Sequence, residues 1–517
     1  LSKLPLIFDK NQNLMMLLGP IIKTALNIHD SIRSTSSHVE LQREVLKNLL
    51  KKAKKTSFGL YYGFESFLKE DDLEHAFAEA VPFFDYHKME EQWWSRTKEG
   101  KPNISWPGTP RFLARSSGTT GKKSKTIPVS DEMIAAIKAA GTRQVSALTN
   151  FDLPSGIFES EVLALGSSTD LTEENGFIIG EISGISASQI PEFLDSFYRP
   201  GKEISSIDDW DERVQKIAEE AKSWDIGMLS GIPSWLEMML KEVMEYNNVD
   251  SIHDIWPNLC VYTSGGVAFE PYRTSFEKLF SKPVQVVDTY LASEGFIACQ
   301  QRPETDAMQL ITDGGIYFEF VPFRPENIEQ DGSIAANAPI VTMAEVEPEV
   351  DYVLTVSGAW RYLIGDTIKF TDVEKAEIKI TGRTKFFLNV VGSQLSVLKM
   401  ETAIIELQSK FDTTIKEFTV SAKKINGDFY HVWYLGTETQ TSEKQLAEAL
   451  DQLLQEANKN YKVARSKALK GVQVNKIHPE TFTKWNNHNN KKGGQVKMEK
   501  VMDEEKFKDW EAFVKSL

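Results

Sequence analysis

The stretch Ser116-Ser117-Gly118-Thr119-Thr120-Gly121-Lys122-Lys123-Ser124-Lys125 is the most informative segment of the chain. Its two glycines permit tight backbone bends that aim several N–H groups at one anion. Five hydroxyl side chains add donors, and three lysines add positive charge. The segment follows the apolar run Phe112–Ala114 and precedes a helix predicted to begin near Ser130. It predicts a phosphate-binding loop, although not a Walker A loop, because its glycines lack that spacing. Taken alone, it also fits a flexible surface loop rich in serine and threonine.

Strand-like apolar runs alternate with helical patterns beyond this loop. The strand-like runs are Ile157–Gly166, Leu259–Tyr262, Val284–Val287, Ile316–Val321 and Tyr352–Val356. The helical stretches are Val39–Lys55, before the loop, and Asp131–Ala147, Ser234–Tyr246 and Glu270–Phe280 after it. This alternation is typical of an α/β architecture with substantial sheet.

The pattern changes near Gly382, where a smaller unit of mixed strands and helices begins. Its strand-like segments are Glu417–Val420 and Phe429–Tyr434, and its helical segments are Ser442–Tyr461 and Glu504–Leu517. A chain of 517 residues is too long for one ordinary core. We therefore predict a large N-terminal α/β domain with a helical N-terminal segment over residues 1–381. A small, mobile C-terminal α+β domain would cover residues 382–517.

Three further segments place polar groups near predicted strands. In Tyr290-Leu291-Ala292-Ser293-Glu294-Gly295, the ring could cover adenine, the hydroxyl could meet a phosphate and the carboxylate could hold Mg²⁺. The motif Trp360-Arg361-Tyr362-Leu363-Ile364-Gly365-Asp366 ends in a carboxylate that could accept both ribose hydroxyls. In Thr263-Ser264-Gly265-Gly266, the glycines would let a flat base lie against the backbone. Singly, each segment is better explained by an ordinary turn or a helix cap.

Together, in this order and separation, the four segments resemble the Gretchen Hagen family of auxin-responsive acyl acid-amido synthetases. This family is a branch of the adenylate-forming superfamily, which includes acyl-CoA synthetases and luciferases. The resemblance runs from about Val45 to the end of the sequence. It also includes the segments Leu49–Gly59, Trp106–Pro110, Gly382–Lys385 and Gly493–Lys497.

The resemblance implies a role in ATP binding or catalysis for individual residues of these segments. The β- and γ-phosphates of ATP would be held by Ser116, Ser117, Gly118, Thr119, Thr120 and Gly121. The adenine slot would be formed by Ser264, Gly265, Gly266 and Tyr290. Ser293 would lie near the α-phosphate, Glu294 would bind Mg²⁺ and Asp366 would hold the ribose. Arg383 would lie at the hinge between the domains, and Lys497 would approach the reacting carboxylate and the α-phosphate.

The implied reaction activates a small-molecule carboxylic acid and transfers its acyl group to an amine, expected to be an amino acid. A carboxylate is a poor acyl donor because its oxide cannot leave, whereas AMP leaves readily from a mixed anhydride. Two anions meet in the adenylation step, so Mg²⁺, lysine and backbone donors must offset their repulsion. A swinging small domain could rebuild the site between the two half-reactions.

The chain departs from the family pattern at three points. Gly392-Ser393-Gln394 replaces a Gly-Glu-Lys-type turn, and the neutral amide of Gln394 cannot supply the lysine charge. Leu363 stands where a second arginine is common, and Met498-Glu499 replace the usual Pro-Arg. Two alternatives therefore stay open. One is an acyl- or aryl-CoA ligase, which shares the first half-reaction, and the other is a degenerate nucleotide-binding protein without turnover.

The net charge, apolar runs and cysteine count of the chain argue against several other classes of protein. A net charge of −15 argues against general binding to nucleic acid or to an anionic membrane. The apolar run Leu14–Ile22 is less than half of a membrane span. Cys260 and Cys299 are the only cysteines, so we expect a reducing, cytoplasmic location and no disulfide framework. The expected oligomeric state is a monomer, and no histidine pair has zinc spacing.

The identity of the acid and of its acceptor is not encoded in these motifs. We expect the acid pocket to be lined by the helix after the phosphate loop and by Leu163–Ser168 and Ser230–Trp235. Arg143 on that helix is a weak candidate for the substrate carboxylate. Exposure of Arg143 on the far face of the helix is the favoured alternative.

Overall fold

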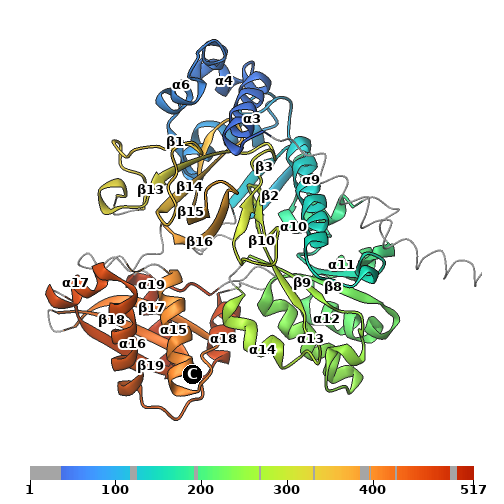
Figure 1. Ribbon diagram of the computed structural model, residues 1–517, viewed down its shortest axis with the longest axis vertical. Helices are drawn as coiled ribbons and strands as arrows, with labels where there is room; N and C mark the ends of the chain where they lie inside the picture. Colours follow the sequence, from blue (N-terminus) through green and yellow to red (C-terminus); the bar gives the residue numbers. More distant parts are fainter. Residues whose placement is uncertain are drawn as a thin grey trace, which may run out of the picture.

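The computed structural model describes residues 36–116, 125–190, 196–266, 269–329, 332–384, 395, 397–425, 428–467, 469–489, 498–502 and 504–517. Seven predicted site residues lie outside these ranges: Ser117, Gly118, Thr119, Thr120, Gly121, Gln394 and Lys497. The described part is a mixed α/β structure with one large sheet and two smaller ones, which confirms the predicted fold class (Figure 1).

The large sheet has a parallel half and an antiparallel half. The parallel strands are, in order from one edge, β7 (Tyr198–Arg199), β4 (Glu161–Leu165), β8 (Ile226–Gly231), β9 (Val261–Gly265) and β10 (Gln285–Ala292). The antiparallel strands continue as β11 (Gly295–Cys299), β12 (Met308–Leu310), β16 (Glu377–Arg383), β15 (Arg361–Asp372), β14 (Asp351–Ser357) and β13 (Tyr317–Pro322). The short β1 (Phe83–Phe84) runs parallel to β15.

Helices α12 (Trp210–Glu220) and α13 (Pro233–Asn247) pack on the parallel half. The helix α13 begins at Pro233, which needs no backbone partner in the first turn, and ends at Asn248 in the left-handed conformation. Their apolar faces share one core with Leu163 and Leu229 of the sheet. Burial on both faces explains why these strands read as nearly continuous apolar runs.

The N-terminal helices cover the antiparallel half (Figure 1). They are α3 (His38–Ala53), α4 (Ser57–Tyr62), α5 (Phe64–Phe67) and α6 (Leu73–Ala80). A capping box between Ser37 and Glu40 fixes the start of α3. The buried amide of Gln42 donates to the carbonyl oxygens of Thr312 (2.7 Å) and Ile316 (2.9 Å), which attaches α3 to the sheet.

The phosphate-loop segment joins two strands of a four-stranded sheet. Its order is β3 (Lys125–Val129), β2 (Phe112–Ser116), β6 (Phe177–Glu181) and β5 (Thr172–Glu174). The strands β2 and β3 are antiparallel, with Ser116 opposite Lys125. The predicted helix follows as α9 (Asp131–Ala147), and Ser130 caps it by accepting from the Met133 N–H at 3.1 Å. The strand β3 was not predicted.

The small C-terminal unit has its own sheet and cores. Its strands are β17 (Glu417–Ile425), β18 (Asp428–Gly436) and β19 (Leu469–Ile477). Its helices are α15 (Val397–Phe411), α16 (Glu443–Ala457), α17 (Lys459–Lys467), α18 (Glu480–His488) and α19 (Glu504–Ser516). Apolar cores lie on both faces of this sheet. In the described ranges, no helix is both long and apolar enough to cross a membrane.

Several elements differ from the sequence predictions. The expected helix Glu270–Phe280 is a 3₁₀ turn, Glu270–Tyr272, followed by α14 (Arg273–Glu277). The expected strand Ile157–Gly166 is a 3₁₀ turn, Ser155–Phe158, followed by β4. The expected helix Ser442–Tyr461 divides at Asn458, whose extended backbone separates α16 from α17. Gly365 and Asp366, expected at a turn before the strand-like Thr367–Phe370, lie inside the twelve-residue strand β15, where Gly365 has a φ of +83°.

Candidate active site

The carboxyl ends of the parallel strands bring the predicted nucleotide and acid segments to one edge of the sheet. Ser264 and Gly265 end β9, and in the sheet register Gly265 lies opposite Thr289 of β10. The expected acid-pocket segments follow β4 and β8, which are the next strands along. Ligands of open α/β sheets bind at this edge. The topology therefore brings the segments predicted to bind nucleotide and acid side by side.

Close backbone approach at this edge requires a glycine. A Cβ on Gly231, at the end of β8, would lie 2.7 Å from the carbonyl oxygen of Leu165 at the end of β4. Gly231 also has a φ of +155°. After β9, Gly266 has a φ of +82°, so the chain turns sharply where the base was predicted to lie.

The Asp366 carboxylate is bonded through both oxygens. Tyr290 Oη donates to Oδ2, and Arg383 Nε lies 2.8 Å from Oδ1. Arg383 also donates from Nη2 to the Ile364 carbonyl oxygen at 2.8 Å, and it faces Asp366 across the β15–β16 register. The structure thus joins three predicted site residues from β10, β15 and β16 in one cluster. Each carboxylate oxygen keeps a second lone pair for a ligand.

Ser293 and Glu294 form the turn between β10 and β11. Burial raises the pKa of the Glu294 carboxyl to about 7, and the negative charge of Asp366 adds to this shift. The positive charges of Arg383 and Lys125 oppose it. Glu294 therefore lies within electrostatic reach of the Asp366 cluster and of the phosphate-loop strand β3.

The oxygen chemistry of this turn fits Mg²⁺ only in part. Across the described ranges, no group of three or more His, Cys, Asp and Glu side chains could hold a metal ion. Magnesium is commonly held by one or two carboxylates together with substrate phosphates. Glu294 fits that pattern, and phosphate oxygens would have to complete the coordination.

Lys125 and Tyr86 connect the phosphate-loop strand to the N-terminal helices. Tyr86 lies on α7 (Tyr86–Met89), and its Oη accepts from the Thr126 N–H at 3.2 Å. The Lys125 ammonium lies 5.2 Å from the centre of the Tyr86 ring. No local sequence pattern marks Tyr86 as a candidate site residue.

Arg143 corrects one expectation about the acid pocket. Its side chain is only 14% exposed, and its Nη2 lies 2.5 Å from the Asp313 carboxylate. The favoured expectation of exposure is therefore wrong, because the turn carrying Asp313 approaches α9. The next residue, Gln144, donates to the Thr289 hydroxyl, which holds α9 against β10.

Lys497 was predicted on the small unit, and the segment that follows it pairs with β17. The Val420 N–H donates to the Lys500 carbonyl oxygen at 2.8 Å. The side chain of Lys500 pairs with Glu417 and lies 4.5 Å from the Phe418 ring centre. Burial raises the pKa of Tyr272, at the end of the 3₁₀ turn Glu270–Tyr272, to about 12, and the charge of Glu417 adds to it. Tyr272 of the large unit therefore lies within electrostatic reach of the Lys500–Glu417 pair.

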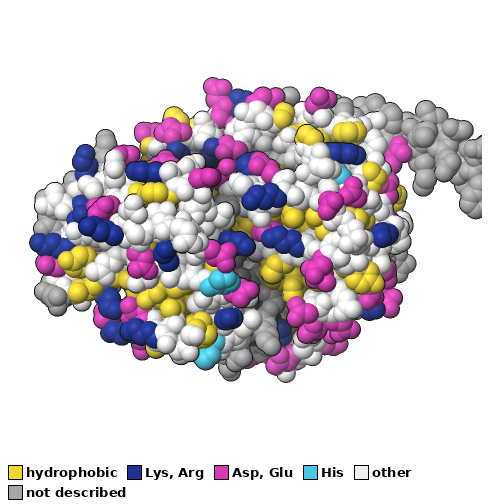
Figure 2. All heavy atoms as spheres, turned by 90° about the horizontal axis from the view of Figure 1, so that it is seen from below, with side chains coloured by type: hydrophobic (Ala, Val, Ile, Leu, Met, Phe, Trp, Pro, Cys, Tyr) yellow, Lys and Arg dark blue, Asp and Glu magenta, His cyan; other side chains and the backbone are white. Residues whose placement is uncertain are grey.

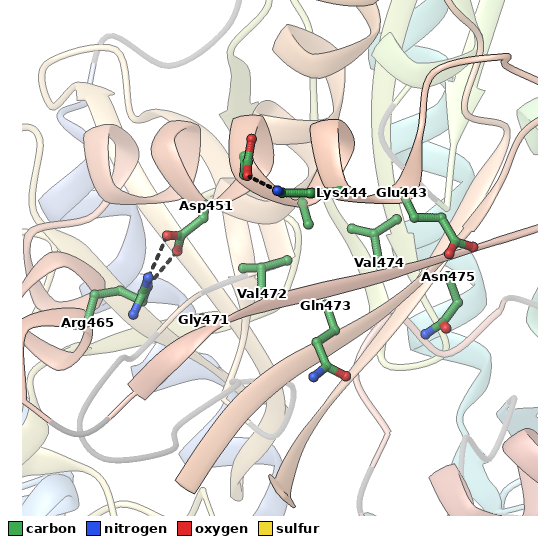
Figure 3. A pocket seen from close by; sticks show the side chains of 11 residues that line it. Glu443, Lys444, Asp451, Arg465, Gly471, Val472, Gln473, Val474 and Asn475 are labelled. Atoms are coloured by element: carbon green, nitrogen blue, oxygen red, sulfur yellow. Dashed lines mark hydrogen bonds and ion pairs between the residues drawn. The ribbon is translucent and has the colours of Figure 1, made fainter.

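The surface groove of the small unit lies apart from this cluster. It has a volume of about 480 Å³ and is lined by α16 and β19, with Asp451 and Arg465 joined by an ion pair (Figure 3). None of the predicted site residues lines this groove. Seen from below the view of Figure 1, acidic and basic side chains are intermixed, without a broad field of one sign (Figure 2).

Three family models match the chain in order. They are the GH3 family N-terminal domain (residues 28–215), central domain (309–383) and C-terminal domain (399–506). The chain belongs to the GH3 family. No curated protein matches this GH3 chain.

Solved structures share the fold of this GH3 chain at low sequence identity. A GH3.15 acyl acid amido synthetase has a TM-score of 0.76 at 15% identity, covering 96% of both chains. The complex of AtGH3.15 acyl acid amido synthetase with 2,4-DB has a TM-score of 0.73 at 17% identity, covering 92% of this chain and 94% of that one. A 2-hydroxyisobutyryl-CoA ligase in complex with 2-HIB-AMP has a TM-score of 0.56 at 12% identity, covering 92% and 91%. The fold is therefore that of adenylate-forming enzymes.

Proposed function

We propose that this chain is an AMP-forming acid–amino acid ligase. It would adenylate a small-molecule carboxylic acid with ATP, release pyrophosphate, and transfer the acyl group to an amino acid with release of AMP. The observation that carries this proposal is the cluster of Tyr290, Asp366 and Arg383 with Glu294 close by, at the carboxyl edge of the parallel strands. Membership of the GH3 family supports amide formation as the second step.

The residues of this edge have distinct parts in the proposed reaction. Asp366, fixed by Tyr290 and Arg383, would accept the ribose hydroxyls through its remaining lone pairs. The end of β9 would hold adenine, and the segment from Ser116 would hold the β- and γ-phosphates. Mg²⁺, held by Glu294 together with phosphate oxygens, would reduce the repulsion between the acid carboxylate and the α-phosphate.

The small unit would supply the second half of the site. We propose a division near residue 382, with residues 1–381 binding ATP and acid and residues 382–517 moving between the half-reactions. Lys497 would approach the reacting carboxylate in the adenylation half-reaction. Neither Cys260 nor Cys299 forms a disulfide, which supports a cytoplasmic location, and we propose a monomer.

The decisive experiment measures AMP release with one panel of acids and two acceptors. We expect AMP formation with acid plus amino acid and none above background with acid plus CoA. Asp366→Ala should abolish AMP formation, whereas Asp372→Ala, at the end of the same strand, should not. AMP formation with acid plus CoA, and none with acid plus amino acid, would establish a CoA ligase. Absence of acid-dependent pyrophosphate exchange into ATP across the panel would leave a nucleotide-binding protein without turnover.

A further inference from the structure

Arg213 is a buried cation without a hydrogen-bonded anion in the part of the chain that the structure describes. It lies near the start of α12, and the residue is only 4% exposed. Its Nε atom is buried without a hydrogen-bond partner, and its guanidinium forms no ion pair with any described residue. Buried charges are normally paired and hydrogen-bonded, because water no longer solvates them. The donors of Arg213 are therefore available to a bound anion.

Two tryptophan rings fix the place of this guanidinium. Its Cζ atom lies 5.4 Å from the centre of the Trp210 ring, within the range of cation–π attraction. The Trp210 ring in turn contacts Trp235 edge to face, with 4.2 Å between the ring centres. Trp235 lies on α13 shortly after the end of β8, in the segment Ser230–Trp235 that is expected to line the acid pocket. Packing thus links Arg213 to the acid side of the candidate active site.

Glu181 is a second, partly buried charge in this region. It ends β6, and burial raises the pKa of its carboxyl, whereas the Ser167 hydrogen bond and the charges of Arg115 and Arg213 oppose this shift. The Ser167 hydroxyl donates to Oε2 of Glu181, and the Ser183 hydroxyl donates to Ser167 at 3.0 Å. Among the described residues, no donor reaches the other oxygen, Oε1. The carboxylate is therefore held from one side and keeps one oxygen for another donor.

The charges of Arg213 and Glu181 interact without direct contact. Burial lowers the pKa of the Arg213 guanidinium, and the charges of Asp208 and Glu181 oppose this shift. Asp208 is exposed to water, which screens its charge. Direct contact with Glu181 would give the strongest attraction. Instead, Trp210 holds the cation and Ser167 holds the anion. A separated cation and anion of this kind are the complement of a zwitterion.

The two charges lie at the same edge of the sheet as the nucleotide cluster. Ser167 follows β4, and β4 is two strands away from β9, whose end carries Ser264. Neighbouring strands are about 4.8 Å apart, so the ends of β4 and β9 are roughly 10 Å from each other. The segments expected to bind the acid lie along this edge. A second substrate bound by Arg213 and Glu181 would therefore lie next to the acid, as amide formation requires.

We propose that Arg213 and Glu181 form the binding site for the acceptor amino acid, with the guanidinium holding its α-carboxylate and the carboxylate holding its α-ammonium group. This inference rests on the proposed function, since the site is needed only if the acyl group passes to an amino acid. Arginine suits this task because its planar fork can bind a carboxylate through two parallel hydrogen bonds. The site therefore selects amino acids in preference to simple amines and to CoA.

The first test compares amino acids with amines that lack only the α-carboxylate. The pairs are alanine with ethylamine, phenylalanine with phenethylamine, and glutamate with γ-aminobutyrate, each with the acid that supports the fastest pyrophosphate exchange. The readout is the ratio of kcat/KM for the amino acid to kcat/KM for its amine. In Arg213→Gln this ratio should fall about 10- to 100-fold, as expected for lost charge-assisted hydrogen bonds. In Arg213→Lys, which keeps the charge but not the fork, the ratio should fall less.

Glu181→Gln separates the two charges of the site. The ammonium group is common to amino acids and amines, so kcat/KM for both should fall and their ratio should stay close to that of wild type. Lys216→Gln is the matched control, because Lys216 is an exposed cation on the same helix and pairs with Glu219. This control should leave the ratio as it is in wild type.

Pyrophosphate exchange, measured on every variant, distinguishes a binding role from a structural one. Exchange needs no acceptor, so Arg213→Gln should change it far less than it changes amide formation with amino acids. Equal losses of exchange and of amide formation with both kinds of acceptor would overturn the acceptor site. If Arg213→Gln does not fold, the ratio in Arg213→Lys decides the question.

The same assays separate this inference from the proposed function. If wild type exchanges pyrophosphate but forms no amide with any amino acid, the proposed function itself fails. If wild type forms amides and the ratio is unchanged in both Arg213 variants, the function stands and the acceptor site is wrong.

Discussion

Arg383 Nε lies 2.8 Å from Oδ1 of Asp366, and the two residues face each other across the β15–β16 pair of the large sheet. Arg383 is therefore both a partner of the candidate ribose ligand and the last residue of β16. The path of the chain toward the small unit starts at a residue that is bonded to the nucleotide cluster. Under the proposed function, this one ion pair would couple nucleotide binding to the start of the path toward the small unit.

Asp366→Asn should raise KM for ATP about 10-fold or more. The substitution keeps the shape of the side chain but removes the charge that pairs with Arg383, and charge-assisted hydrogen bonds contribute roughly 1.5–3 kcal/mol. The measurement is acid-dependent pyrophosphate exchange at varied ATP. Asp372→Asn is the matched control, since Asp372 is bonded to Lys375 on the surface. Equal KM values for the two variants would remove Asp366 from the nucleotide site.

Lys497→Ala should affect the two half-reactions unequally. We expect pyrophosphate exchange to fall strongly, because a positive charge would be lost where the carboxylate meets the α-phosphate. Transfer from a preformed acyl adenylate should fall less, and single-turnover assays can measure it. Arg383→Pro fixes φ at the proposed hinge and also removes the ion pair with Asp366, so its control is Arg383→Ala, which removes the ion pair alone. We expect Arg383→Pro to reduce the complete cycle further than Arg383→Ala does. Equal losses in the two half-reactions for Lys497→Ala, together with equal complete cycles for the two Arg383 variants, would favour a fixed two-domain site.

The buried pair Arg361–Glu319 should be essential for stability and not for nucleotide binding. Arg361 Nε donates to Glu319 Oε2 at 2.7 Å, and Nη1 donates to the carbonyl oxygens of Ala78 and Val81. Arg361→Met would leave the buried Glu319 carboxylate unpaired, which typically costs roughly 3–5 kcal/mol. Thermal unfolding should show a lower Tm for Arg361→Met than for Glu319→Gln, because Arg361 also holds the N-terminal helices. The reverse order would contradict this account.

His431 should make the small unit sensitive to acid. Burial lowers the pKa of His431 to about 3, and neither ring nitrogen has a hydrogen-bond partner among the described residues. The unfolded chain, with a histidine pKa of about 6.5, binds the proton more strongly than the folded one. Stability from this residue is therefore complete above about pH 6.5 and falls as the pH decreases toward 3.

His431→Phe should remove most of that acid sensitivity. The new ring can pack against Tyr461, whose ring centre lies 5.4 Å from that of His431, and no unpaired ring nitrogen remains. We expect Tm at pH 7 to stay equal or rise, and its fall between pH 6.5 and 4.5 to become smaller. A steeper fall in the variant would show that His431 is not the group that titrates.

Elements with local signals could be predicted from the sequence, whereas others could not. The helix α9 has the predicted bounds, because Ser130 caps its start and its apolar spacing is helical. The strand β19 was missed, since Gly471 and its lysines, Gln473 and Asn475 are poor strand formers. Its pairing with β18 arises only after α16 and α17 have brought it there.

In the candidate site, too, some residues could be predicted from local motifs, whereas their contacts could not. The motifs containing Tyr290 and Asp366 were both selected, but as separate contacts to adenine and ribose. Their hydrogen bond joins residues 76 positions apart, so only the folded sheet reveals it. Tyr86 was not selected at all, because its contact with Thr126 depends on how α7 docks against β3.

The pairing of residues 498–502 with β17 determines when the small unit can finish folding. Thr419 Oγ1 donates to the Glu499 carbonyl oxygen at 2.8 Å, a contact between residues 80 positions apart. At about 5–20 residues per second, the ribosome takes roughly 4–16 s to add that length of chain. During this interval β17 lacks its outer partner, and unpaired strand edges associate readily with other chains. The nascent chain therefore exposes this strand edge until residues 498–502 have emerged, and slower synthesis or added holding chaperones should raise its soluble yield.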